Sequence, residues 1–267
     1  MFKSLFLIAV SFSVFSSTNG FYQIEEGLSG YELKDKLKRL LAKNHKDQGY
    51  SALIRIYLKS DADLTYDGDG SIVDMYSESP NYSDSYNYDN AHESCGSYKR
   101  ESDCYNREHL FPQSIFHKRS PMRSDFFHVY PSDGYVNGKR SNHPFGEVNR
   151  PSWTSSNGSK LGKNTFGNYR GTVFEPIDEF KGDIARALFY FATRYGDKAG
   201  SWKHHEMLNG SKDQVYKTWF VKLLLKWHKM DPVSQHEIQR NNVGQKFQGN
   251  RNPFIDHPEW VEAIWGN

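Results

Sequence analysis

The sequence predicts a single-domain α+β protein, and three observations favour this class. Apolar residues recur at helical spacing near the N-terminus and through the C-terminal third, which is therefore expected to be mainly helical. Short β-branched and aromatic stretches between these regions predict strands. The 267 residues, 37% of them hydrophobic, show no internal repeat and no clear linker. A chain of this size can bury one sizeable core.

Residues 1–20 have the pattern of an export signal. Lys3 supplies a short positive region, residues 5–15 are apolar, and residues 18–20 form a small-residue exit. The stretch is too short to span a membrane, and no later segment reaches the roughly eighteen apolar residues of a spanning helix. We therefore expect residues 21–267 to form one secreted or periplasmic monomeric domain without membrane contact.

The N-terminal part of the mature chain predicts one helix and two strands. Residues 31–44 are expected to be helical because leucines recur on one face among lysines. Residues 51–59 predict a strand from their β-branched content and alternation. A turn at Asp67-Gly68-Asp69-Gly70 precedes a second strand at residues 72–76, and the polar region 79–104 predicts an irregular loop.

The acids around this turn are spaced as in a calcium loop, since Glu78 follows Asp67 by eleven residues. An EF-hand, however, needs glycine at its sixth position, where this chain has Ile72. The alternation that follows is strand-like, so the sequence favours a hairpin over a calcium site.

The middle of the chain predicts a ββα unit. One strand is expected to end at Glu108-His109, and a second is expected at residues 125–131, where Pro131 ends it. Ser132 or Asp133 can then cap a helix that carries Asn137 about one turn in.

The remaining elements are a loop and three helices. Residues 149–172 are rich in Gly, Ser and Asn and predict a loop. Helices are expected at residues 181–195, 213–230 and 257–265, with Pro258 at a tolerated early position in the last one.

The two cysteines, Cys95 and Cys104, lie close together in a polar region. One small disulfide is the expectation, in agreement with export. A Cys–His metal site would need further ligands at suitable spacing, and none accompany them.

The net charge of +2 is nearly balanced, but the charges are distributed unevenly. Residues 61–110 hold twelve acids and three Lys/Arg, whereas residues 111–170 hold nine Lys/Arg and three acids. The basic block includes Lys139 and Arg140. It is either an electrostatic footprint for nucleic acid or an ordinary solvated face, and charge alone does not choose between them.

Together, the acid–histidine pair, the carboxamide of Asn137 and the two following cations are the parts that a one-metal phosphodiester hydrolase needs. The sequence resembles the endonuclease I family of periplasmic and secreted non-specific nucleases, within the ββα-metal (His-Me finger) superfamily. Five runs in the family's order carry the resemblance, at residues 106–114, 131–142, 174–176, 181–187 and 248–254.

The resemblance implies specific roles. Glu108 and Asn137 would bind one Mg²⁺, with Mn²⁺ or Ca²⁺ as substitutes, and His109 would be the general base. DNA and RNA would be cut with little sequence preference to 5′-phosphate products. From its position beside these groups, Arg107 could stabilise the transition state, although strand alternation would point it away from Glu108.

Two positions depart from the family's pattern. Some relatives carry an acid where this chain has Arg123, and others carry a histidine where it has Phe127, so that only His128 of that pair is present. We therefore assign no catalytic role to Arg123 or His128.

Two functional alternatives stay open at this stage. A secreted glycosidase would use paired carboxylates, and the acids of residues 61–108 do not exclude such a pair. A non-catalytic nucleic-acid-binding module would need only the basic patch. A zinc protease is excluded because Glu108 is not flanked by two histidines one helical turn apart.

Overall fold

The computed structural model describes residues 20–80 and 82–266, so the expected export signal lies outside them except for Gly20. The helices are α1 (Gly30–Asn44), α2 (Ala52–Ser60), α3 (Gly134–Arg140), α4 (Lys181–Tyr195), α5 (Thr218–Met230), α6 (Gln235–Gln248), α7 (Pro253–Asp256) and α8 (Glu259–Trp265). The strands are β1 (Tyr105–His109), β2 (Val129–Asp133), β3 (Pro151–Thr154), β4 (Lys160–Lys163) and β5 (Thr172–Glu175). The α+β class is confirmed. No helix in the described part is long and apolar enough to cross a membrane.

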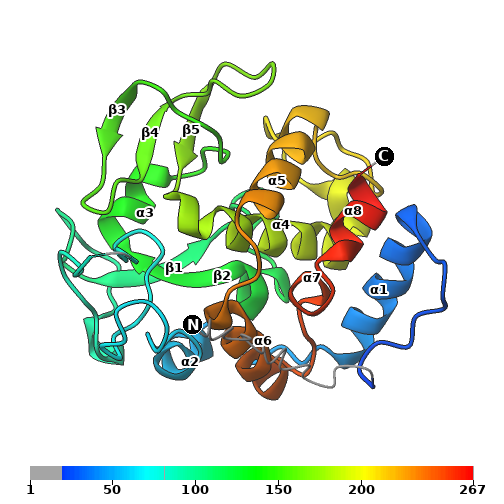
Figure 1. Cartoon of the computed structure of the whole chain (residues 1–267), viewed down its shortest axis with the longest axis horizontal. Coiled ribbons are helices and arrows are strands. Elements are labelled where there is room, and N and C mark those ends of the chain that lie inside the picture. The colour runs from blue at the N-terminus through cyan, green and yellow to red at the C-terminus, as the bar shows by residue number, and fades with distance from the viewer. Residues whose placement is uncertain (1–19, 81, 267) are drawn as a thin grey trace, which may run out of the picture.

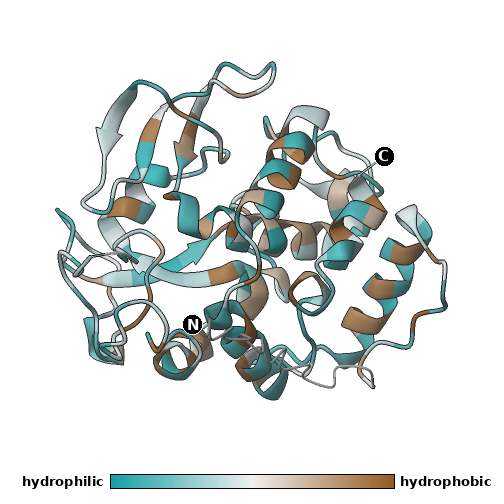
Figure 2. Cartoon of the chain, in the orientation of Figure 1, coloured by the Kyte–Doolittle hydropathy of each residue, from teal (hydrophilic) through white to brown (hydrophobic). Residues whose placement is uncertain are grey.

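Helix α4 occupies the centre of the molecule (Figure 1), with α1, α5 and α8 on one side and the β1–β2 ribbon on the other. All of its residues except Arg194 are buried. Hydrophobic and hydrophilic turns alternate on α1 and α5 in Figure 2, as expected of helices that bury one face. The buried Arg186 of α4 bonds Glu237 of α6 at 2.6 Å through both Nε and Nη2, so its charge is compensated.

The ββα unit is present as predicted. β1 and β2 pair antiparallel with Glu108 opposite Tyr130 and His109 opposite Val129. The Asp133 carboxylate accepts a hydrogen bond from Val136 N at 2.8 Å and caps α3. The pairing of β1 with β2 and the turn from β2 into α3 thus place the end of β1 next to α3.

The second strand differs from the prediction in its bounds. Residues 126–128 form a 3-10 turn, because the Asp125 carboxylate accepts a hydrogen bond from Phe127 N. The strand starts at Val129 and continues through Pro131, which pairs with Arg107. Proline is tolerated there because each strand of a two-stranded ribbon has an open edge.

Two other strand predictions are wrong. Residues 52–60 form α2, because Leu53 and Tyr57 lie one turn apart and bury their side chains on one face that packs against α6. Residues 72–76 do not form a strand, and the expected hairpin reduces to an isolated bridge between Ala62 and Ile72. The Asp74 carboxylate ends the extended run by accepting a hydrogen bond from Tyr76 N at 2.9 Å.

The region predicted as a loop at residues 149–172 contains most of a three-stranded sheet in the order β3–β4–β5. Its strands have four residues each, and β3 is largely exposed. Too few buried positions alternate for the sequence to indicate a strand.

The helices predicted at residues 31–44 and 181–195 are confirmed as α1 and α4. Helix α5 begins at Thr218 rather than at residue 213, after Val215 adopts a positive φ of 65°. Pro258 is the N-cap of α8 and not part of it. Helix α6 was not predicted, since its residues show almost no apolar stripe.

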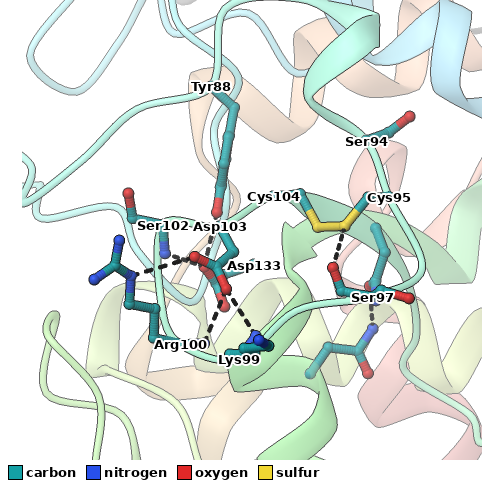
Figure 3. Close-up of a disulfide and its surroundings, with 12 residues drawn as sticks. Tyr88, Ser94, Cys95, Ser97, Lys99, Arg100, Ser102, Asp103, Cys104 and Asp133 are labelled. Carbon is teal, nitrogen blue, oxygen red and sulfur yellow. Dashed lines mark hydrogen bonds and ion pairs between the residues drawn. A yellow bond between two sulfur atoms is a disulfide. The ribbon is translucent and has the colours of Figure 1, made fainter.

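The predicted disulfide between Cys95 and Cys104 is confirmed (Figure 3). Around it, the backbone N–H of Gly134 donates to Cys104 O at 2.8 Å, and Cys95 N–H donates to Tyr105 O at 3.0 Å. Figure 3 also shows the Tyr88 hydroxyl donating to Asp133. The disulfide therefore fastens the start of β1 to the loop before it, next to the N-terminus of α3.

Candidate active site

A cavity of about 290 Å³ opens where β1 meets α3. Its walls include five residues singled out from the sequence: Arg107, Glu108, His109, Asn137 and Arg140. Lys139 does not line it. Cys95 of the disulfide also lines it. Asn106, Gln113 and Asn142 line it as well; they belong to the runs that resemble the family but had no predicted role, and Tyr50 was not predicted at all.

Glu108 is buried, with 2% of its surface exposed, and one of its oxygens is occupied. Oε1 accepts a hydrogen bond from the Tyr76 hydroxyl at 2.9 Å and lies 3.2 Å from Nη1 of Arg140. Burial raises the pKa of Glu108, while the Arg140 charge and the Tyr76 hydroxyl oppose that rise. The backbone N–H of His109 also acts on this carboxylate and opposes the rise. Within residues 20–80 and 82–266, no side chain bonds Oε2, and that atom is not enclosed. The carboxylate can therefore offer an oxygen to a ligand in the cavity.

His109 is held by its Nε2 atom, which lies 3.0 Å from the carbonyl oxygen of Arg123. Because a carbonyl only accepts hydrogen bonds, Nε2 carries the proton and Nδ1 keeps its lone pair. The Tyr50 ring stacks on the imidazole, with centroids 5.6 Å apart and planes at 29°. Burial, followed by neighbouring His128, holds the pKa of His109 well below 6.5. The imidazole is thus a neutral base at neutral pH.

Asn137 lies on α3 and is oriented by Asn106 of β1. Its Nδ2 donates to Asn106 Oδ1 at 2.6 Å, which directs the Asn137 amide nitrogen toward the strand. No other hydrogen bond of this side chain occurs in the described residues, so the Asn137 Oδ1 atom has no partner there. Two oxygen donors that no described side chain bonds, one from Glu108 and one from Asn137, therefore line the same cavity. Such a donor set suits a hard divalent cation.

Arg107 reaches the cavity despite the direction that strand alternation predicts. Its Cζ lies 3.7 Å from the centroid of the Tyr50 ring, and its Nη1 donates to Tyr50 O at 3.1 Å. Arg123 lies over the same ring at 4.3 Å. Two guanidinium groups and one phenol thus form a cationic wall beside His109.

Arg140 and Lys139 occupy different environments. The Arg140 guanidinium is buried and donates to the carbonyl oxygens of His109 at 3.0 Å and Leu110 at 2.6 Å. It therefore joins the end of β1 to α3 and supplies the positive charge beside Glu108. Lys139 lies outside the cavity, with Nζ 5.0 Å from the centroid of the Tyr135 ring.

Of the two positions that depart from the family's pattern, Arg123 lies beside His109. Phe127 lies behind the site, next to the remaining histidine of that pair, His128. His128 is fully buried, and its ring centroid is 5.6 Å from that of His109. The Phe127 ring packs against Tyr190 at 5.2 Å. Neither residue lines the cavity.

Two hydrogen bonds from the acidic segment also hold the site in place, and the sequence did not predict them. Besides the Tyr76 hydroxyl on Glu108, the Asp74 carboxylate accepts a hydrogen bond from Asp133 N at 2.7 Å. The segment is more than thirty residues from β1 in places, and its sequence has no local feature that indicates these contacts.

Comparison with known proteins identifies the class. The model of the family described as Endonuclease I matches residues 29–259, and the chain belongs to this family. An extracellular ribonuclease of Bacillus amyloliquefaciens is 33% identical over 258 residues, which cover 94% of this chain and 79% of that protein. An extracellular ribonuclease of Bacillus subtilis (strain 168) is 32% identical over 276 residues, covering 98% and 84%. A periplasmic deoxyribonuclease of Aeromonas hydrophila is 29% identical over 140 residues, covering 51% and 48%.

The family resemblance found in the sequence is therefore confirmed. Its relatives are named as nucleases, which supports a nuclease function, hydrolysis of phosphodiester bonds, and a nucleic-acid substrate for this chain. Membership of this family favours a nuclease over the two alternatives left open by the sequence, a secreted glycosidase and a non-catalytic nucleic-acid-binding module.

Proposed function

We propose that this chain is an exported, Mg²⁺-dependent endonuclease that cleaves DNA and RNA with little sequence preference and leaves 5′-phosphate ends. The observation that supports it most strongly is the shared cavity. A neutral histidine with a free Nδ1, two oxygen donors that no side chain within the described residues bonds, and the cationic side chain of Arg107 all line one cavity next to the end of β1.

Glu108 and Asn137 would hold the metal ion through Oε2 and Oδ1, and Mn²⁺ or Ca²⁺ could substitute for Mg²⁺. When bound, the ion would polarise the scissile phosphate and stabilise negative charge on it and on the leaving oxygen. Tyr76 and Arg140 favour the ionised form of the Glu108 carboxylate and orient it by occupying its other oxygen.

His109 would act as the general base. Its Nδ1 would take a proton from the water molecule that attacks phosphorus, while Nε2–H stays bonded to the Arg123 carbonyl. That bond and the stacked Tyr50 ring fix the imidazole plane, so proton transfer needs no reorientation of the ring. The resulting imidazolium would be short-lived, because burial favours the neutral form.

Arg107 would stabilise charge on the phosphate in the transition state, since its guanidinium lines the cavity. Lys139 would contact the nucleic-acid backbone outside the cavity. For Arg140 we propose a change of role: both of its Nη atoms already bond protein oxygens and its Nε is buried, so it would position Glu108 and not bind phosphate directly.

The substrate range and location follow from the relatives. Two relatives that align with nearly the whole chain are named as extracellular ribonucleases, and partial relatives are named as deoxyribonucleases. We therefore propose activity on both polymers, and export to the periplasm or the medium, for a monomeric enzyme.

The test is cleavage of supercoiled plasmid DNA and of RNA with Mg²⁺, with EDTA, and by the His109→Ala variant. Loss of a general base lowers the rate about 10²–10⁴-fold. The matched control is His92→Ala, which removes an exposed histidine that does not line the cavity. The proposal fails if both polymers stay intact with Mg²⁺, and His109 is not the base if His109→Ala cuts as fast as the control.

Two further measurements separate the parts of the proposal. Product ends should accept labelled phosphate from a 5′-kinase only after phosphatase treatment, and immediate labelling would contradict 5′-phosphate products. Asn137→Ala should need at least tenfold more Mg²⁺ for half-maximal rate, and an unchanged Mg²⁺ dependence would remove Asn137 from the metal site.

A further inference from the structure

A second group of carboxylates, apart from the cavity, lies in the acidic segment. Asp63, Asp67 and Asp69 each offer an oxygen, and these oxygens all lie within 4.8 Å of one another. The turn that holds them is closed by backbone bonds from Asp63 N to Ser71 O at 2.7 Å and from Gly70 N to Asp63 O at 3.0 Å. None of these residues lines the active cavity.

Glu78 supplies an independent indication of a ligand. Only 1% of its surface is exposed, and among residues 20–80 and 82–266 its buried Oε1 has no hydrogen-bond partner. Burial, then the charges of Asp84, Asp63 and Asp67, raise the pKa of Glu78 to about 9. A buried carboxylate surrounded by like charges is costly unless a cation neutralises it.

The loop that follows Glu78 closes over the three aspartates. Ser79 N donates to Asp84 Oδ1 at 2.6 Å, and Asn87 Nδ2 donates to Asp69 Oδ2. The Asp84 carboxylate is near enough to Asp67, Asp69 and Asp63 to be affected by their charges. Asn87 thus joins this later segment to Asp69, and Asp84 adds a further acid close to the three aspartates.

No side-chain cation compensates this charge. Residues 61–90 contain eight acids and not one lysine or arginine. Among residues 20–80 and 82–266, no Lys, Arg or His nitrogen lies within 4.0 Å of the carboxylates of Asp63, Asp67, Asp69, Glu78 or Asp84. Sequence segments far along the chain do not supply the missing charge either.

We propose that this cluster binds one Ca²⁺ ion, with Asp63, Asp67 and Asp69 as ligands and with Glu78 and Asp84 adding charge or further oxygens. Calcium accepts six to eight oxygens in irregular geometry, whereas Mg²⁺ demands a near-ideal octahedron and keeps its waters. The site is not an EF-hand, because Asp63 precedes the acid series that suggested one, and, although α2 ends just before the loop, no α-helix follows it within the described residues before α3. Its Asp67 and Asp69 carboxylates are exposed, which gives the ion access from solvent.

The test is calcium binding by the full chain after removal of metals with a chelator. Titration calorimetry with CaCl₂ should find one site in addition to any binding in the active cavity. Calcium at ten times its dissociation constant should raise the melting temperature by about 3–6 °C. The proposal fails if 10 mM CaCl₂ changes neither heat nor melting temperature.

Two double variants locate the ion. In Asp67→Asn, Asp69→Asn the calcium-induced shift should fall to whatever binding in the active cavity produces, while in chelator this variant should melt at or above the parent temperature because like charges have been removed. Asp89→Asn, Asp197→Asn removes two exposed charges outside the cluster and should keep the parent's shift. Retention of the full shift by the first variant, or its loss in the second, would overturn the proposal.

A third variant, Glu108→Gln with Asn137→Ala, distinguishes the proposed calcium site from the active cavity. This variant should keep the calcium-induced shift that the aspartate cluster produces. If that variant loses the shift, the ion belongs to the active cavity and the proposal is wrong. Because the readout is binding and melting, the result does not depend on nuclease activity.

Glu78→Gln tests the buried member of the cluster. A raised pKa means that Glu78 costs stability as the pH rises above about 4.5, so this variant should melt above the parent in chelator at pH 8. Its calcium affinity should fall at least tenfold. Unchanged affinity together with unchanged stability would exclude Glu78 from the site.

Discussion

Tyr76→Phe removes one hydroxyl from behind the proposed metal ligand. That hydroxyl donates to Glu108 Oε1 at 2.9 Å, and both side chains are almost completely buried. Phenylalanine keeps the ring in place against Phe174, whose centroid lies 4.9 Å away, so the change leaves no large void. The perturbation is therefore the loss of one hydrogen bond to a buried carboxylate.

The expected cost follows from the charge on the acceptor. A hydrogen bond to a charged group contributes about 1.5–3 kcal/mol, which corresponds to a drop of about 3–12 °C in melting temperature for a chain of this size. Arg140 remains 3.2 Å from the same oxygen, so Glu108 keeps its counter-charge but loses one constraint on its orientation. Loss of such a constraint behind a metal ligand typically weakens metal affinity or activity about 10–100-fold.

The assay combines thermal unfolding with the dependence of plasmid cleavage on Mg²⁺ concentration. The matched control is Tyr216→Phe, because its buried hydroxyl donates to a neutral acceptor, Leu188 O, at 2.8 Å. The control should lose about 0.5–1.5 kcal/mol and keep the parent's Mg²⁺ dependence. If Tyr76→Phe also keeps the parent's Mg²⁺ dependence and turnover, then Glu108 does not depend on this hydrogen bond for catalysis.

Three further outcomes are expected. The rate plotted against pH should keep its plateau below pH 6.5, because a lowered pKa keeps His109 neutral there, and an acid limb at or above 6.5 would contradict a buried base. Gly244→Ala should lower the free energy of unfolding by about 1–2 kcal/mol in denaturant, because its new Cβ would lie 2.6 Å from an aromatic ring and this overpacking outweighs the helix gain of about 1 kcal/mol. Gly200→Ala, whose Cβ would meet open space, should not lower it. Serine at both Cys95 and Cys104 should cost about 2–3 kcal/mol in the same assay, and an equal midpoint would show that the disulfide is a surface clip.

Local patterns were sufficient for the ββα unit and the long helices. Helix α1 and helix α4 span fifteen residues each, so their apolar spacing repeats over several turns. The N-cap at Asp133 is a local interaction with Val136, three residues away. Because these signals depend only on neighbouring residues, they are readable before the chain is folded.

Elements defined by distant partners were not predicted. The nine residues of α2 alternate like a strand, and packing against α6 decides for the helix. Strands β3 to β5 have only four residues each, and their pairing with one another creates them. Helix α6 shows no apolar stripe, although Ser234 and Glu237 form a capping box that could have indicated its start.

The sequence alone determined which chemical groups this nuclease has: an acid, a histidine and a carboxamide, each near the end of a predicted element. The tertiary structure decided the state of those groups. The sequence allowed Arg140 to be a phosphate-binding cation, but its side chain is buried and supplies the counter-charge of Glu108. The free Nδ1 of His109 depends on the carbonyl of Arg123, fourteen residues away. Burial and hydrogen bonding set a group's charge and its available atoms, and both arise only when distant segments pack together.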